Sequence, residues 1–225
     1  MLYIVSTPIG NLKDITLRAI ETLKSVDLIA AEDTRHSKIL LNAYEITTPL
    51  TSYYEHNKLS KSSYLLKLLQ EGKDIALISD AGTPGISDPG YVLIKLAKEN
   101  DVAITAIPGA TAFVAALTVS GMPASSFTFE GFLPVKTVAR QKKLKTFEDG
   151  KKTILFYEAP HRVVKTLGDI KDVLNDPIVV CARELTKKFE EVKQGKASEL
   201  VEYFSQKTPR GEFVFILGSH GNYLS

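Results

Sequence analysis

Short runs of β-branched and apolar residues alternate with longer segments of helical period along this chain. Glycine, proline and aspartate bound the short runs, which is typical of strands. The alternation predicts an α/β fold in which strand and helix units surround a mostly parallel sheet. In the first half we expect strands at 2–6, 28–31, 75–79 and 102–107, and helices at 14–25, 37–44, 59–70, 89–100 and 111–118. In the second half we expect strands at 127–132, 153–157, 178–182 and 212–217, and helices at 138–147, 163–174 and 198–204.

A stretch of small residues and proline at 120–126 has the composition of a domain junction. The 225 residues, 44% of them apolar, are enough for two compact units with cores of their own. We therefore expect an N-terminal α/β domain at 1–119 and a C-terminal α/β domain at 120–225.

Composition narrows the classes of protein that the chain can belong to. Its single cysteine, Cys181, lies in an apolar run, so we expect a buried thiol, no internal disulfide and a cytoplasmic location. The start lacks the pattern of a signal peptide, and no apolar run approaches a membrane span, so no membrane partner is expected. No histidine and cysteine spacing indicates a metal site. Because the net charge is only +2, any affinity for nucleic acid must come from a local basic surface.

Three turns rich in glycine, proline and small residues each follow a predicted strand, at 6–11, 79–90 and 107–112. The carboxyl ends of parallel strands are where α/β proteins bind ligands, so these turns predict one pocket. None of them matches a dinucleotide or nucleoside-triphosphate loop, which favours a ligand without phosphates. S-adenosyl-L-methionine is such a ligand, with an adenine for an apolar slot and polar ends for backbone and hydroxyl partners. The alternative is that the glycines serve only tight strand-to-helix connections.

Charged groups follow three other strands, at 32–36, 158–162 and 183–188. All three segments could serve catalysis or RNA binding. The structural alternatives are a capped helix start at Asp33 or Thr34 for 32–36, an interdomain pair for 158–162, and an ion-pair network for 183–188. The segment 136–152 is basic and could follow an RNA backbone. It could equally be a solvated helix face whose packed side is Leu144 and Phe147.

Taken together, these motifs resemble the tetrapyrrole methylase superfamily and, within it, the ribosomal RNA small subunit methyltransferase I family. The matching stretches are 6–11 with Asp14 and Arg18, 31–35, 80–90, 108–112, 159–162 and 183–187. They extend over nearly the whole chain. Many superfamily members carry Gly-Asp-Pro where this chain has Gly82, Thr83 and Pro84, and the ribosomal branch shares the threonine form. The threonine therefore favours RNA over a tetrapyrrole as substrate.

The resemblance implies a two-domain tetrapyrrole-methylase-like fold with S-adenosyl-L-methionine in the interdomain cleft, and a homodimer. It implies 2′-O-methylation of a decoding-centre cytidine in the 16S rRNA of the small ribosomal subunit. The cofactor-binding residues that it implies are Pro8, Asp80, Gly82, Thr83, Pro84, Ile86, Thr111, Ala112, Tyr157, Ala182, Gly211 and Glu212.

The methyl group is already activated in this donor, so no metal is required, but a base would help a neutral hydroxyl to attack. The candidate bases are Glu32, Asp33, His161 and Glu184. The residues expected to place RNA phosphates are Arg18, Arg35, Arg162, Arg183 and Lys187. Two other functions remain open at this point: a precorrin-type tetrapyrrole methyltransferase, and a non-catalytic RNA-binding module, which binding of the donor would argue against.

Overall fold

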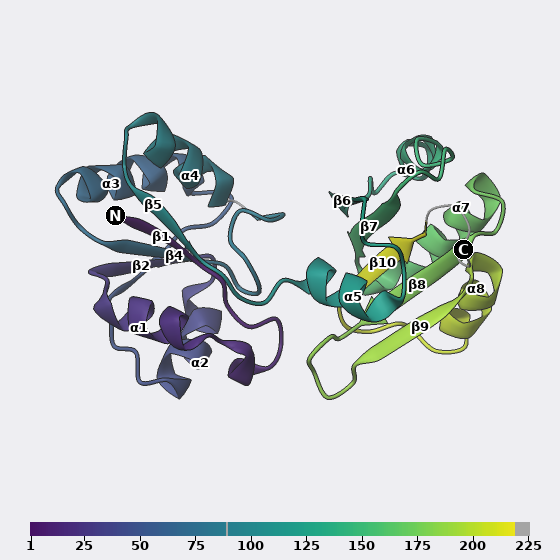
Figure 1. Cartoon of the computed structure of the whole chain (residues 1–225), viewed down its shortest axis with the longest axis horizontal. Coiled ribbons are helices and arrows are strands. Elements are labelled where there is room, and N and C mark those ends of the chain that lie inside the picture. Colours follow the sequence, from purple (N-terminus) through teal and green to yellow (C-terminus); the bar gives the residue numbers. More distant parts are fainter. Residues whose placement is uncertain (89, 219–225) are drawn as a thin grey trace. The chain divides into compact units, whose positions relative to one another are not determined.

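The computed structural model of the chain describes residues 1–88 and 90–218. Within it the chain divides into two compact units, Met1–Thr111 and Ala112–Ser225 (Figure 1). Each unit has a five-stranded sheet covered by helices. The α/β class predicted from the sequence is confirmed.

The first unit is built on a parallel sheet with the strand order β3-β2-β4-β1-β5. Its strands are β1 (Leu2–Val5), β2 (Leu28–Ala31), β3 (Leu50–Ser52), β4 (Ile75–Ile78) and β5 (Ile104–Ile107). Its helices are the 3₁₀ turn η1 (Leu12–Asp14), α1 (Leu17–Ser25), α2 (Thr34–Ala43), α3 (Lys58–Gln70) and α4 (Gly90–Glu99). The strands β4, β1 and β5 are neighbours, so the turns that follow them share one edge of the sheet.

Helices cover both faces of this first sheet (Figure 1). On one face, α1 and α2 pack against a core that includes Val5 and Ile78. On the other face, α3 and α4 pack against a core that includes Ile4 and Leu77. Successive residues of a strand point to opposite faces, so a strand buried on both sides reads as one continuous apolar run. This explains why the apolar runs at 28–31 and 75–78 form strands.

The second unit has a mixed sheet with the strand order β6-β7-β10-β8-β9. Its strands are β6 (Phe127–Phe132), β7 (Thr153–Glu158), β8 (Ile178–Arg183), β9 (Glu191–Lys196) and β10 (Phe213–Leu217). Its helices are α5 (Ala112–Ser120), α6 (Thr137–Lys145), the 3₁₀ turn η2 (Pro160–Arg162), α7 (Val163–Val173) and α8 (Ala197–Ser205). Only β6 and β7 pair in parallel, and the other neighbours are antiparallel. The expectation of a mostly parallel sheet is thus correct for the first unit and wrong for the second.

One face of the second sheet carries the core of this unit. Leu144 of α6, Leu167 of α7 and Phe204 of α8 pack there with alternate residues of β10, including Phe215. Cys181 of β8 is also buried in this core, as predicted. Helix α5 contacts β10, β7 and β8. It therefore belongs to the second unit, and the two units meet at 111/112, before the boundary at 119/120 expected from the junction-like stretch.

Two strands, β3 and β9, were not predicted from the sequence. The β9 segment is polar and mostly exposed, because it is an edge strand and lacks the alternation that marks a half-buried strand. The β3 segment is only three residues long and also lies at an edge. No helix in the described ranges is long and apolar enough to span a membrane.

Candidate functional site

The three predicted turns meet at one edge of the first sheet, as expected from the sequence. The turn after β1 and the turn after β4 are joined by a pair of backbone hydrogen bonds. Thr7 N donates to Gly82 O over 2.9 Å, and Gly82 N donates to Thr7 O over 3.1 Å. Gly82 adopts a φ of +83°, which glycine tolerates better than other residues. This geometry explains the glycine at the centre of the second turn.

A row of hydroxyl groups joins all three turns. The Thr83 hydroxyl oxygen lies 2.9 Å from Ser6 Oγ and 2.7 Å from Thr111 Oγ1. It also lies 3.3 Å from the carbonyl oxygen of Ala110. A Cβ added to Gly109 would come within 2.9 Å of the Ser6 Cβ, so this glycine allows the first and third turns to approach closely. Thr83 is thus the centre of an uncharged hydrogen-bonded group.

The far end of the second turn is held by Asp88. Its carboxylate accepts hydrogen bonds of 2.7 Å from the backbone N–H groups of both Gly85 and Gly90. Ile86 remains 39% exposed between these points. Small residues and neutral hydroxyls suit the ribose and amino-acid ends of S-adenosylmethionine. The turns of the first unit therefore fit this donor.

Three carboxylates gather at the exits of β2 and β4. Asp33 N donates to Asp80 Oδ1 over 2.9 Å, and Asp80 N donates to Glu32 Oε2 over 3.4 Å. Burial raises the pKa of Glu32, the Asp80 backbone N–H opposes this, and the charges of Asp80 and Asp88 raise the pKa further. A base with a raised pKa is suited to accept a proton near neutral pH. Burial thus shifts the pKa of Glu32 in the direction that suits a proton acceptor.

Asp33 serves a different purpose. Its carboxylate caps α2 by accepting from Arg35 N over 2.8 Å, and it forms an ion pair with the Arg35 guanidinium. The hydrogen bonds from Arg35 lower the pKa of Asp33 to about 2, which makes it a poor base. The Arg35 side chain is 90% exposed, and Arg18 on α1 is exposed as well.

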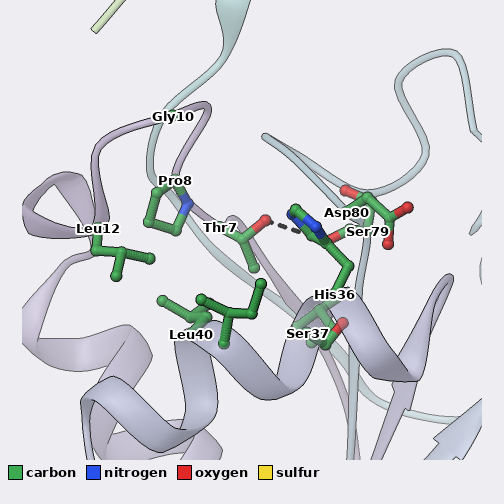
Figure 2. A pocket seen from close by; sticks show the side chains of 11 residues that line it. Thr7, Pro8, Gly10, Leu12, His36, Ser37, Leu40, Ser79 and Asp80 are labelled. Atoms are coloured by element: carbon green, nitrogen blue, oxygen red, sulfur yellow. Dashed lines mark hydrogen bonds between the residues drawn. The ribbon is translucent and has the colours of Figure 1, made fainter. Parts of the chain in front are cut away.

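A cavity of about 230 Å³ opens beside Asp80 (Figure 2). Three elements of the first unit line it: Pro8 and Leu12 follow β1, Ser37 and Leu40 lie on α2, and Ser79 and Asp80 follow β4. The sequence interpretation missed the contribution of α2. The spacing of His36, Ile39 and Leu40 on one helix face was the available signal.

In the second unit, the exit of β8 and the approach to β10 form an ion-pair group. Lys187 Nζ lies 3.0 Å from Glu184 Oε1 and 2.8 Å from Glu212 Oε2. Glu212 N also donates to Glu184 Oε1 over 3.0 Å. Burial alone would raise the pKa of Glu184, but the hydrogen bonds from Lys187 and the Glu212 backbone hold it below its ordinary value. Glu184 is therefore less suited than Glu32 to act as a base.

The backbone of this segment is unusual. Glu184 and Thr186 adopt positive φ angles of 50° and 67°, which costs about 1–3 kcal/mol for residues other than glycine. Gly211 has a φ of +88°, and a Cβ there would lie 2.4 Å from the Glu184 side chain. Arg183 Nε lies 3.5 Å from Glu191 Oε2. The structure thus brings together the residues predicted at 183–187 and 211–212.

Tyr157 and Ala182 lie in one row of the second sheet, because both are register partners of Val214 in β10. Ala182 is fully buried. The Tyr157 ring meets the rings of Phe129 and Phe132 edge to face, at centroid distances of 4.9 and 5.6 Å. Burial raises the pKa of the Tyr157 hydroxyl, with an opposing hydrogen bond from the backbone of Phe113. This aromatic group offers an apolar surface at the carboxyl end of β7.

Arg162 lies inside the second unit. Its Nε is 3.0 Å from Glu158 Oε1, and its Nη2 donates to the carbonyl oxygen of Leu133 over 2.9 Å. Glu158 itself is only 2% exposed and also accepts from Thr166. The spacing of Glu158 and Arg162, four residues apart, could have indicated this pair. His161 is exposed beside it.

In the basic segment 136–152, some of the basic side chains form ion pairs and others are exposed. Arg140 is 1% exposed and forms a buried ion pair with Asp169 of α7. Lys143 pairs with Glu130 over 2.7 Å. Exposed lysines remain at positions 136, 142, 145, 151 and 152.

Within the described ranges, no group of three or more metal-binding side chains is present.

The chain is similar in sequence and fold to known methyltransferases. The family model described as Tetrapyrrole (Corrin/Porphyrin) Methylases matches residues 1–201. A relative named Ribosomal RNA small subunit methyltransferase I, from Synechocystis, is 49% identical, with coverage of 96% of this chain and 78% of the relative. A relative of the same name from Thermotoga maritima is 46% identical, with coverage of 96% and 97%. The X-ray structure of a cobalt precorrin-4 methyltransferase superposes with a TM-score of 0.70 at 18% identity, with coverage of 96% and 94%.

Proposed function

Because the chain belongs to the tetrapyrrole methylase family and, within it, to the ribosomal RNA small subunit methyltransferase I family, we propose that it methylates the 2′-hydroxyl of a decoding-centre cytidine in 16S rRNA. The chain is an S-adenosylmethionine-dependent methyltransferase. The single structural observation that supports the proposal is the meeting of three turns at the hydroxyl groups of Ser6, Thr83 and Thr111, with Glu32 hydrogen-bonded to the second turn through Asp80 N. The relatives named for ribosomal RNA favour RNA as substrate over a tetrapyrrole.

The residues proposed to hold the donor come from both units. In the first unit they are Pro8, Asp80, Gly82, Thr83, Pro84, Ile86 and Thr111, and in the second they are Ala112, Tyr157, Ala182, Gly211 and Glu212. Bound S-adenosylmethionine supplies a methyl group that its sulfonium already activates. The hydrogen bonds among Ser6, Thr83 and Thr111 hold the turns in place before any ligand arrives. Orientation of this kind can contribute roughly 7–11 kcal/mol to lowering a barrier.

Glu32 is our proposed general base for the attacking hydroxyl. Burial keeps its proton affinity high, and the hydrogen bond from Asp80 N holds its carboxylate in place. Asp33 and Glu184 have lowered pKa values, which makes both weaker bases. His161 remains a candidate in the proposal because it is exposed.

Contacts with RNA phosphates are proposed for Arg18, Arg35, Arg183 and Lys187. The first two are exposed, and Arg35 also pairs with Asp33. Arg162 was also predicted to bind RNA, but its guanidinium already forms an ion pair with Glu158 and a hydrogen bond to the carbonyl oxygen of Leu133 inside the second unit. The proposal further includes a homodimer, a cytoplasmic location and the small ribosomal subunit as partner.

The decisive experiment locates the transferred methyl group. The purified protein is incubated with labelled S-adenosylmethionine and small subunits from a strain that lacks the modification, and the labelled nucleotide is mapped. We expect label on the ribose of a single cytidine. Label on a base atom, or no label while the protein still binds the donor, would overturn the proposed reaction.

A further inference from the structure

The cavity beside Asp80 has the size and lining of a site for one flat ring. Its volume of about 230 Å³ far exceeds the roughly 10–15 Å³ that one water needs and is smaller than the roughly 300–1,000 Å³ of typical pockets for larger ligands. Pro8, Leu12 and Leu40 make much of the wall apolar. Figure 2 shows the exposed His36 ring beside Asp80. Aromatic rings of this kind stack on unpaired RNA bases.

Polar groups are confined to one side of this cavity. Thr7 Oγ1 donates to the Ser79 carbonyl over 3.2 Å, so that hydroxyl is already engaged (Figure 2). Asp80 Oδ1 accepts from Asp33 N, but a carboxylate has further acceptor sites. The buried Ser37 hydroxyl has no hydrogen-bond partner in the described part of the chain. A buried polar group without a partner is costly, which indicates that a ligand can complete its bonding.

The cavity is separate from most of the residues proposed to hold the donor. Thr83 bonds to Thr111 and to the carbonyl oxygen of Ala110. Gly82, Thr83 and Thr111 do not line the cavity, whereas Pro8 and Asp80 do. Asp80 also bonds to Glu32, the proposed base. A ring in the cavity would therefore lie next to the proposed base and would leave Gly82, Thr83 and Thr111 to the donor, with Pro8 and Asp80 between the two ligands.

We propose that this cavity binds the base of the target nucleotide, with the Asp80 carboxylate accepting a hydrogen bond from the exocyclic amine of cytosine. The inference rests on the proposed function and adds a specificity-determining residue to it. Carboxylates recognise the cytosine amine in this way, and single-stranded bases are read by stacking and by hydrogen bonds to their edges. Uridine carries a carbonyl at the same position, which would face the carboxylate and repel it.

The first test blocks the cavity. Ile39 lines it from a 60% exposed position on α2, so Ile39→Trp can fill the space without disturbing the core. Lys38→Trp, at the neighbouring exposed position, is the matched control because Lys38 does not line the cavity. For Ile39→Trp we expect kcat/KM for small subunits to fall about tenfold or more, with unchanged affinity for S-adenosylmethionine in calorimetry. Lys38→Trp should behave like the unmodified protein.

The second test exchanges specificity. Small subunits carrying uridine at the methylated position should react about tenfold or more slowly with the unmodified protein. Asp80→Asn should recover part of this rate, because its amide can donate to the uridine carbonyl while its oxygen still accepts from Asp33 N.

The outcomes separate the two proposals. Loss of donor affinity in Ile39→Trp would assign the cavity to the donor, and normal methylation by that variant would show that no base enters it. Either result overturns this inference and leaves the proposed function intact. Equal rates on cytidine and uridine subunits would overturn the role of Asp80. If the unmodified protein binds the donor yet methylates no small-subunit RNA, the proposed function fails and this inference fails with it.

Discussion

At the scale of single residues, Glu32 and Asp33 show what a motif can and cannot reveal. The sequence places two carboxylates side by side after a strand, and both were reasonable candidates for a base. Their environments differ because Asp80, 48 positions away from Glu32, donates its backbone N–H to one, while Arg35 binds the other. A motif predicts which residues gather at a strand exit. It does not predict which of them is buried, because burial depends on contacts that are distant in sequence.

Replacing Glu32 by glutamine tests its role as base. The amide keeps an oxygen for the Asp80 N–H but cannot accept a proton, so we expect the single-turnover rate to fall about 10²-fold or more. In the unmodified protein, the rate should rise with pH through a pKa above the ordinary 4.5, because the base acts only when deprotonated and burial raises its pKa. This rise should disappear in Glu32→Gln. Glu21→Gln, at an exposed position of α1, is the control, and a normal pH profile in Glu32→Gln would exclude Glu32 as base.

At the scale of elements, the sequence predicted the strands whose burial on both faces gives a continuous apolar run. It did not predict β3 and β9, which lack such a run. The turns after β1, β4 and β5 could be placed at one edge because small residues and glycine follow three apolar strands. The polar edge strand β9 could not be recognised, because its residues are paired through backbone and carry no apolar alternation. The lining that α2 gives to the cavity was missed because the residues at 32–36 were interpreted as a helix cap or as catalytic and RNA-binding groups, and the face of the helix that follows was not considered.

The close approach of the first and third turns can be tested with Gly109→Ala. The added Cβ would lie 2.9 Å from the Ser6 Cβ, so the turns must separate and the hydroxyl row must shift. We expect the affinity for S-adenosylmethionine, measured by calorimetry, to fall about tenfold, or about 1.4 kcal/mol. Gly168→Ala on α7 meets no atom within 4 Å and should bind normally. Equal affinities of the two variants would show that the turn spacing does not matter to the donor.

The buried ion pair between Arg140 of α6 and Asp169 of α7 predicts a large effect on stability. Asp169→Ala leaves the Arg140 charge buried without its partner, which should cost about 3–5 kcal/mol of unfolding free energy. Urea denaturation measures this cost. Asp172→Ala, at a side chain 66% exposed on the same helix, should change stability by less than about 0.5 kcal/mol. A small effect of Asp169→Ala would mean that water or other groups compensate the arginine.

At the scale of the whole molecule, the sequence predicted two α/β units but not how they differ. The first sheet is parallel and covered on both faces, so its strands are continuous apolar runs that the sequence displays plainly. The second sheet is mixed, and the amino-acid sequence does not show which of its strands pair in parallel and which pair antiparallel. Helix α5 follows a turn of the first unit yet packs on the sheet of the second, so its membership depends on packing and not on chain order.

The second unit should fold by itself, because its core draws only on residues after 111. We expect a protein made of residues 112–225 to give dispersed amide resonances and one cooperative thermal transition. A version that begins at 120 lacks α5 and should be markedly less stable, since α5 covers part of β10. If both versions melt alike, α5 contributes little to this unit.

The position of β1 has a consequence for synthesis of the protein. Strand β1 sits between β4 and β5, whose residues are made some seventy and one hundred positions later. At roughly 5–20 residues per second, the nascent chain carries an unmatched apolar strand for on the order of 4–15 s before β4 emerges. During that interval the strand is open to wrong partners. An enzyme proposed to modify ribosomes therefore exposes its own β1 segment at the ribosome, where chaperones that hold extended apolar peptides would encounter it.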